Sequence, residues 1–176
     1  SPEGSAIPGG PAAPQAAHAF WIDFEYALGH DGELIGSAYA GITFINSDGL
    51  PWMYGDSNTG FYNTYSVDLG LEWLGGFYNH YGYGWAWLGT SGNWGRIDFD
   101  NKDGTYFEAR YTSGSDLTLE AYDLMDNLLD SDTKPPNRRY IEGALDMGYL
   151  HVDAPPGTQI AWVKIHDSGN YWLIDN

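Results

Sequence analysis

The sequence predicts an all-β protein that folds as a two-sheet antiparallel β-sandwich. Its 176 residues include 14 Tyr, 8 Trp and 7 Phe, and bulky aromatic side chains favour pleated, half-buried surfaces. Its 24 Gly supply the tight turns that connect short strands. Short apolar segments also alternate with turn sequences rich in Gly, Asn, Asp and Pro, which is typical of consecutive antiparallel strands. A chain of this length suits one hydrophobic core.

The N-terminal segment differs from the rest of the chain. Residues 1–19 are rich in Pro, Gly and Ala and show no hydrophobic period, which indicates an arm or linker. From Phe20 onward the apolar segments begin. We therefore expect a flexible arm over residues 1–19 and a β-sandwich domain over residues 20–176.

The strands are expected where apolar segments are bounded by turn residues. In chain order these segments are 20–26, 38–45, 62–69, 85–88, 96–99, 106–111, 117–123, 144–152, 159–166 and 171–174. Strands this short and numerous predict two packed sheets rather than one.

The strand at 117–123 has the clearest pattern, because every second residue is apolar, as on a half-buried strand. The segment that follows it, 122–129, has leucines that would also fit a helical period. The pair Asp126 and Asn127 is typical of a turn, so we favour a strand and turn there over a helix.

The charge of the chain excludes several partners. Seven Lys and Arg oppose 24 Asp and Glu, which gives a formal net charge of -17. Phosphate backbones and anionic lipids would be repelled, so nucleic acid is not an expected partner. The sequence has no apolar run of the roughly 20 residues that span a bilayer, so we expect no membrane insertion. It has no cysteine, which excludes disulfides and thiolate metal sites.

Short motifs along the chain resemble secreted bacterial jelly-roll domains, including carbohydrate-binding modules and exported proteins of the PEP-CTERM type. The opening motifs are Ile22-Asp23-Phe24-Glu25, Gly32-Glu33-Leu34-Ile35 and Tyr39-Ala40-Gly41-Ile42-Thr43-Phe44, the central strand and turn are 119–123 and 126–129, and the closing hairpin is 162–176. The resemblance covers most of residues 20–176. It implies a jelly-roll-like sandwich and a secreted or cell-surface location.

The resemblance also implies a structural calcium ion that joins the first and last strands. Calcium takes six to eight hard oxygen ligands, and the ends of the domain carry carboxylates and amides. The implied ligands are Glu25 and Asp175, with Asp48 and Asp31 as weaker candidates from adjoining turns. The alternative is that Glu25 and Asp175 accept hydrogen bonds from the backbone.

An aromatic cluster within residues 73–94 could bind a glycan, because sugar rings present apolar faces that stack on Trp and Tyr. Strand alternation can bury much of this cluster in the core. Glycine or asparagine residues flank Tyr81, Tyr83 and Trp94, so these three are the candidate ligand-binding residues.

Catalytic motifs have little support. The histidines lack zinc-ligand spacing, and no Gly-x-Ser-x-Gly motif is present, so we name no catalytic residue. The sequence thus favours a non-catalytic extracellular calcium-binding module with possible carbohydrate recognition. Two alternatives remain open, a secreted polysaccharide hydrolase or lyase and a structural protein of the cell surface or matrix.

Overall fold

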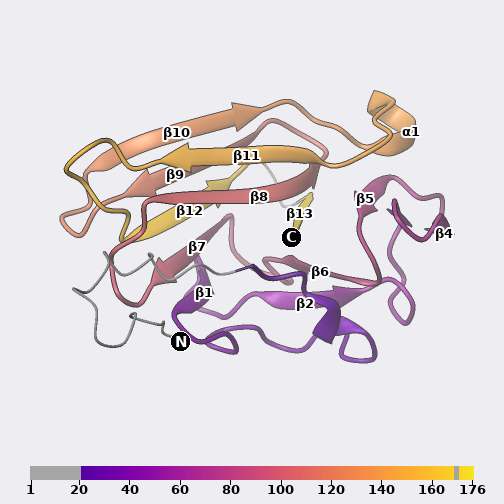
Figure 1. Ribbon diagram of the computed structural model, residues 1–176. Coiled ribbons are helices and arrows are strands. Elements are labelled where there is room, and N and C mark those ends of the chain that lie inside the picture. Colours follow the sequence, from indigo (N-terminus) through magenta and orange to yellow (C-terminus); the bar gives the residue numbers. More distant parts are fainter. Residues whose placement is uncertain (1–20, 169–170) are drawn as a thin grey trace, which may run out of the picture.

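The computed structural model describes residues 21–168 and 171–176, and it confirms the predicted fold class. Two five-stranded antiparallel sheets pack face to face as a β-sandwich, with a small three-stranded sheet beside them (Figure 1). The predicted arm, residues 1–19, lies outside the described residues. No helix in the described ranges is long and apolar enough to cross a membrane.

The strands are assigned to the sheets as follows. The first sheet contains, in spatial order, β1 (Ile42–Asn46), β7 (Trp94–Phe99), β12 (Trp162–His166), β9 (Leu117–Tyr122) and β10 (Leu128–Lys134). The second sheet contains β11 (Gly148–Asp153), β8 (Tyr106–Ser113), β13 (Trp172–Asp175), β6 (Gly84–Trp87) and β2 (Met53–Asp56). The third sheet contains β4 (Leu71–Trp73), β3 (Thr64–Ser66) and β5 (Tyr78–His80), and β3 is parallel to β5. Among the described residues, two short helices complete the fold, the 3-10 helix η1 (Glu25–Ala27) and α1 (Arg139–Glu142).

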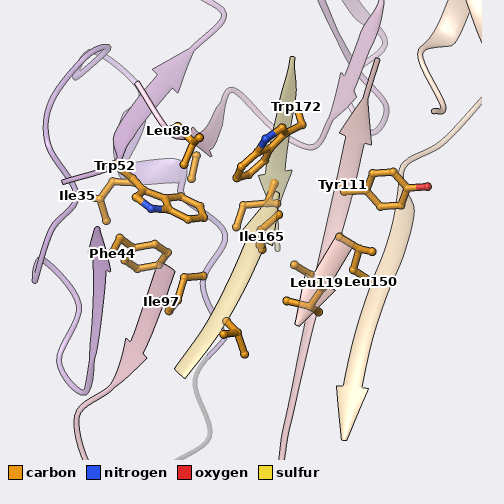
Figure 2. Close-up of a cluster of buried hydrophobic side chains, with 14 of the residues drawn as sticks. Ile35, Phe44, Trp52, Leu88, Ile97, Tyr111, Leu119, Leu150, Ile165 and Trp172 are labelled. Carbon is orange, nitrogen blue, oxygen red and sulfur yellow. The ribbon is translucent and has the colours of Figure 1, made fainter. Parts of the chain in front are cut away.

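The main core lies between the first two sheets, and strand alternation determines which side chains enter it. In β9 every second residue is buried, from Leu117 through Leu119 to Ala121, as the sequence pattern predicts. Figure 2 shows Trp52 between Phe44 and Trp172, and its ring meets both of theirs edge to face. The Trp52 Nε1 donates a hydrogen bond to a backbone carbonyl at 3.0 Å, so this buried polar atom has a partner.

The edge of the second sheet at β11 is covered by side chains from β10. These two strands lie side by side in Figure 1. Asp132 Oδ2 accepts a hydrogen bond from the His151 N–H at 2.9 Å, and Asp130 Oδ2 accepts one from the Asp153 N–H at 2.9 Å. Backbone donors at this edge are therefore paired without a further strand.

The outer face of the second sheet carries a smaller core. Its buried residues are Trp85, Met147 and Leu173, and partly buried tyrosines of the segment before β6 pack against them. The third sheet is formed within residues 57–83, the segment that connects β2 to β6 and also supplies these tyrosines.

The structure corrects one prediction that concerns the ends of the domain. Residues 21–26 do not form the predicted first strand, because η1 begins at Glu25 and Phe24 adopts a left-handed conformation with φ 59°. The last strand, β13, instead pairs with β6 and β8. The predicted first strand, which the implied calcium ion was expected to join to the last strand, is therefore absent from the described part of the chain.

The other predicted strands overlap observed ones, with shifted ends. The segment after β9 forms a turn followed by β10, which confirms the strand-and-turn interpretation of residues 122–129. Four observed strands were not predicted, namely β2, β4, β5 and β10.

Candidate functional site

The turn between β5 and β6, residues 81–83, and the first residue of β6, Gly84, are held by three carboxylates from distant parts of the chain. They belong to Glu25, Asp68 and Asp175. Each of the four consecutive backbone N–H groups donates to one of them: Tyr81 to Asp175 Oδ2 at 2.7 Å, Gly82 to Asp68 Oδ1 at 2.7 Å, Tyr83 to Glu25 Oε1 at 2.9 Å and Gly84 to Glu25 Oε2 at 2.9 Å. We call this arrangement the carboxylate clamp.

Local structure before the first helix places Glu25 in the clamp. The Asp23 Oδ1 accepts the Glu25 N–H at 3.0 Å, and the buried Phe24 side chain anchors the segment in the core. The close approach to β6 requires glycine at position 84, because a Cβ there would lie 2.1 Å from the Phe24 carbonyl oxygen. The sequence thus sets both the position of η1 and its distance from β6.

Burial dominates the electrostatics of the clamp. It raises the pKa of Asp175 well above the ordinary 3.8, opposed by the N–H groups of Tyr81 and Asn176, and the charges of Glu25 and Asp23 raise it further. Burial also raises the pKa of Glu25 above 4.5, against the hydrogen bonds from the turn. The clamp therefore concentrates negative charge that four backbone N–H groups offset only in part.

The four predicted metal ligands do not form one group. Glu25 and Asp175 come together on the turn, as expected, although through the backbone of residues 81–84 rather than through strand pairing. Asp31 instead accepts the N–H of Asp56 and the Tyr62 hydroxyl, and Asp48 lies in the β1–β2 turn. Within the described ranges, no three His, Asp or Glu side chains are placed to hold a metal ion together.

The predicted glycan-binding aromatics lie in two separate places, the turn between β5 and β6 and the start of β7. Tyr81 packs on the small core of the second sheet, where the Arg110 guanidinium lies 4.6 Å from its ring centre. Tyr83 meets Trp73 edge to face. Trp94 begins β7 in the first sheet, with the Lys164 amine 4.9 Å from its ring centre. The structure brings Tyr81 and Tyr83 onto one turn and leaves Trp94 apart from them.

A pocket that was not predicted opens between the two large sheets. Its volume is about 330 Å³, and Asp175 of the clamp forms part of its wall. The first sheet contributes residues of β1 and β7, and the second contributes residues of β8, β11 and β13. Because the residues that line the pocket come from many separate segments, no local sequence motif marks it. The one feature of the sequence that could have indicated the pocket is Trp21, a large aromatic residue three positions before Phe24, the first buried residue described.

The rim of the pocket combines exposed aromatic rings with charged groups. Trp21 is 75% exposed, Tyr106 is 58% exposed and Tyr149 is 44% exposed. The Arg110 guanidinium lies 4.5 Å from the Tyr149 ring centre. Glu108 Oε2 lies within hydrogen-bond distance of His151 Nδ1, at 3.2 Å. The rim therefore offers both apolar ring surface and hydrogen-bonding groups to a ligand.

A serine and a histidine do meet elsewhere in the structure. Ser57 Oγ lies 2.9 Å from His80 Nε2, and His80 Nδ1 lies 3.2 Å from the Tyr81 carbonyl oxygen. Both residues are fully buried, and Ser57 Oγ also contacts Thr64 and accepts the Trp85 indole N–H. Burial lowers the pKa of His80 to about 4. This cluster is a buried hydrogen-bond network, enclosed away from any substrate.

Comparison with known proteins adds no family assignment. No protein-family model matches the chain, and a search of curated proteins finds no match. Function is therefore argued from the geometry of the pocket and the clamp.

Proposed function

We propose that the protein is a non-catalytic binding module that recognises carbohydrate at the rim of the pocket between its sheets. The observation that carries the proposal is the combination of exposed aromatic rings and hydrogen-bonding side chains around one concave opening. An extracellular location, which the resemblance to secreted jelly-roll domains implies, belongs to the same proposal.

The chemistry of the rim suits a sugar. Trp21 offers a ring face to the apolar C–H surface of a pyranose. Glu108 accepts hydrogen bonds from hydroxyl groups, and the Arg110 guanidinium donates them. Pockets that bind small molecules typically combine apolar walls with a few polar groups that orient the ligand.

The absence of a catalytic role is supported by how the acidic and nucleophilic groups are engaged. Asp175 is fully buried, and both its oxygens and those of Glu25 accept backbone N–H groups. The contact between Ser57 and His80 is enclosed. Groups held in this way stabilise the fold and are not free to transfer protons to a substrate.

We also propose a weak calcium ion at the clamp. The negative charge of Glu25 raises the pKa of Asp175, and a cation would relieve this repulsion. The pair supplies few of the six to eight oxygens that calcium takes, so water would complete the shell and the affinity would be in the millimolar range of extracellular modules. The ion would stabilise the fold and have no part in glycan contact.

A glycan-array screen followed by calorimetric titration tests carbohydrate recognition. We expect Trp21→Ala to weaken binding of the selected glycan at least tenfold, because stacking on the rim is lost. Phe61→Ala is the matched control, since Phe61 is 91% exposed and is not part of the pocket lining. Folded protein that binds no glycan on the array would overturn the proposal and favour a structural role.

A further inference from the structure

The interior of the pocket differs in chemistry from its rim. Behind the polar opening, the walls consist of apolar side chains from both large sheets and from the residue before η1. These are Phe24, Ile42, Phe44, Ile97, Phe99, Phe107, Ala109 and Ile174. A carbohydrate would occupy only the rim, because its hydroxyl groups would lose hydrogen bonds to water among these side chains.

We propose that the ligand is a neutral glycoside whose apolar alkyl or aryl group inserts between the sheets while its sugar stays at the rim. This inference rests on the proposed carbohydrate recognition and names the class of ligand more narrowly. The volume of about 330 Å³ exceeds the roughly 150 Å³ of an engineered apolar cavity that binds benzene. It therefore has room for an aryl group or a short alkyl chain.

The charge around the pocket selects a neutral head group. Glu108, Asp103 and Asp175 line the pocket together with one cation, Arg110, and the whole chain has a formal net charge of -17. A fatty acid or another anionic amphiphile would be repelled at the opening. A sugar head group is uncharged and can use the Glu108 carboxylate at the rim as a hydrogen-bond acceptor.

Binding of defined amphiphiles tests the inference. Octyl β-D-glucoside below its micelle concentration, methyl β-D-glucoside and octanoate are titrated against the full chain, with tryptophan fluorescence and calorimetry as readouts. Each buried methylene strengthens binding by roughly fourfold. We therefore expect octyl glucoside to bind at least tenfold more tightly than methyl glucoside, and octanoate to bind more weakly than octyl glucoside.

Two variants locate the binding in the pocket. Ala109→Leu fills the interior, and Thr105→Trp places a bulky ring at the exposed edge of the lining without entering the core. Both should reduce octyl glucoside binding at least tenfold. The control is Thr90→Trp, because Thr90 is also exposed and does not line the pocket. The melting temperature of each variant shows whether it is folded. If Ala109→Leu does not fold, Thr105→Trp still tests whether octyl glucoside binds in the pocket.

The possible failures are distinguishable. Equal affinity for octyl and methyl glucoside, with a glycan still bound on the array, would overturn the apolar insertion and leave carbohydrate recognition intact. Octanoate that binds as tightly as octyl glucoside would overturn the neutral head group. Octyl glucoside that binds equally well to both pocket variants would overturn the assignment to this pocket.

Discussion

Glu25 and Asp175 bind the backbone of the same turn, Glu25 through the N–H groups of Tyr83 and Gly84 and Asp175 through that of Tyr81. The two carboxylates come from opposite ends of the domain, and the negative charge of Glu25 raises the pKa of Asp175. The turn thus fastens η1 to the end of β13. It also links the clamp to the pocket, because Asp175 lines both.

The first prediction concerns pH. The folded-state pKa of Asp175 is raised above 3.8, so protonation favours the folded protein. Its stabilising contribution is complete below the ordinary pKa and is lost as the pH rises through the raised value. In urea denaturation from pH 4 to pH 7, the stability of the natural chain should therefore fall relative to Asp175→Asn, which cannot ionise. If the free energies of unfolding of the two proteins change equally with pH over this range, the raised pKa of Asp175 would be contradicted.

The second prediction concerns calcium. At ten times a millimolar Kd, the ion should raise the free energy of unfolding by about 1.4 kcal/mol, and chelation with EGTA should reverse the effect. Glu25→Gln should abolish this response, and magnesium at the same ionic strength is the control because it requires a stricter octahedral geometry. Identical melting temperatures in calcium and EGTA would rule out the ion.

The third prediction concerns the approach of η1 to β6. Gly84→Ala would place its Cβ 2.1 Å from the Phe24 carbonyl oxygen and 2.7 Å from the Ala27 Cβ. Relief of this clash must move η1, so we expect a loss of about 3 kcal/mol in the free energy of unfolding.

Gly157→Ala is the control for this change. It has open space around the new Cβ, and its φ of +79° predicts a cost of about 1 kcal/mol. Chemical denaturation measures both variants, and equal losses would show that the contact with Phe24 does not limit position 84.

The fourth prediction concerns the edge of the second sheet. Asp130→Ala and Asp132→Ala each leave one backbone N–H of β11 without its partner, at a cost of about 1 kcal/mol. The double variant should also self-associate, because an unpaired strand edge can pair with another chain. Light scattering measures this association. Ser131→Ala, at the exposed position between the two, should remain like the natural chain, and a monomeric double variant would contradict the proposed protection.

Strand alternation made much of the sandwich predictable from sequence. The residues of β9 alternate between the core and the outer face, and a period of two has this meaning wherever one face is buried. The same reasoning fails at residues 21–26. Phe24 enters the core from a left-handed backbone position rather than from a strand, and an apolar residue between two acids looks identical in both cases.

The site was predictable only in part for a related reason. The meeting of Glu25 and Asp175 was expected from the resemblance to jelly-roll domains, but their shared partner, a set of backbone N–H groups, has no side-chain signature. The same limit applies to the pocket, because its buried lining residues cannot be told from ordinary core residues in the sequence. Examples are Ile42, Ile97, Ala109 and Ile174. Their relation becomes visible only when the two sheets are placed together.

The position of β13 affects how the protein can be made in the cell. This strand lies between β8 and β6 in the middle of the second sheet, where Ile174 is opposite Tyr111 on one side and Ala86 on the other. While residues 172–175 are still inside the ribosome, the two flanking strands have no neighbour between them. Completion of the sheet must therefore wait until translation has passed residue 175. Until then β8 and β6 each expose one unpaired edge, although their other edges pair with β11 and β2.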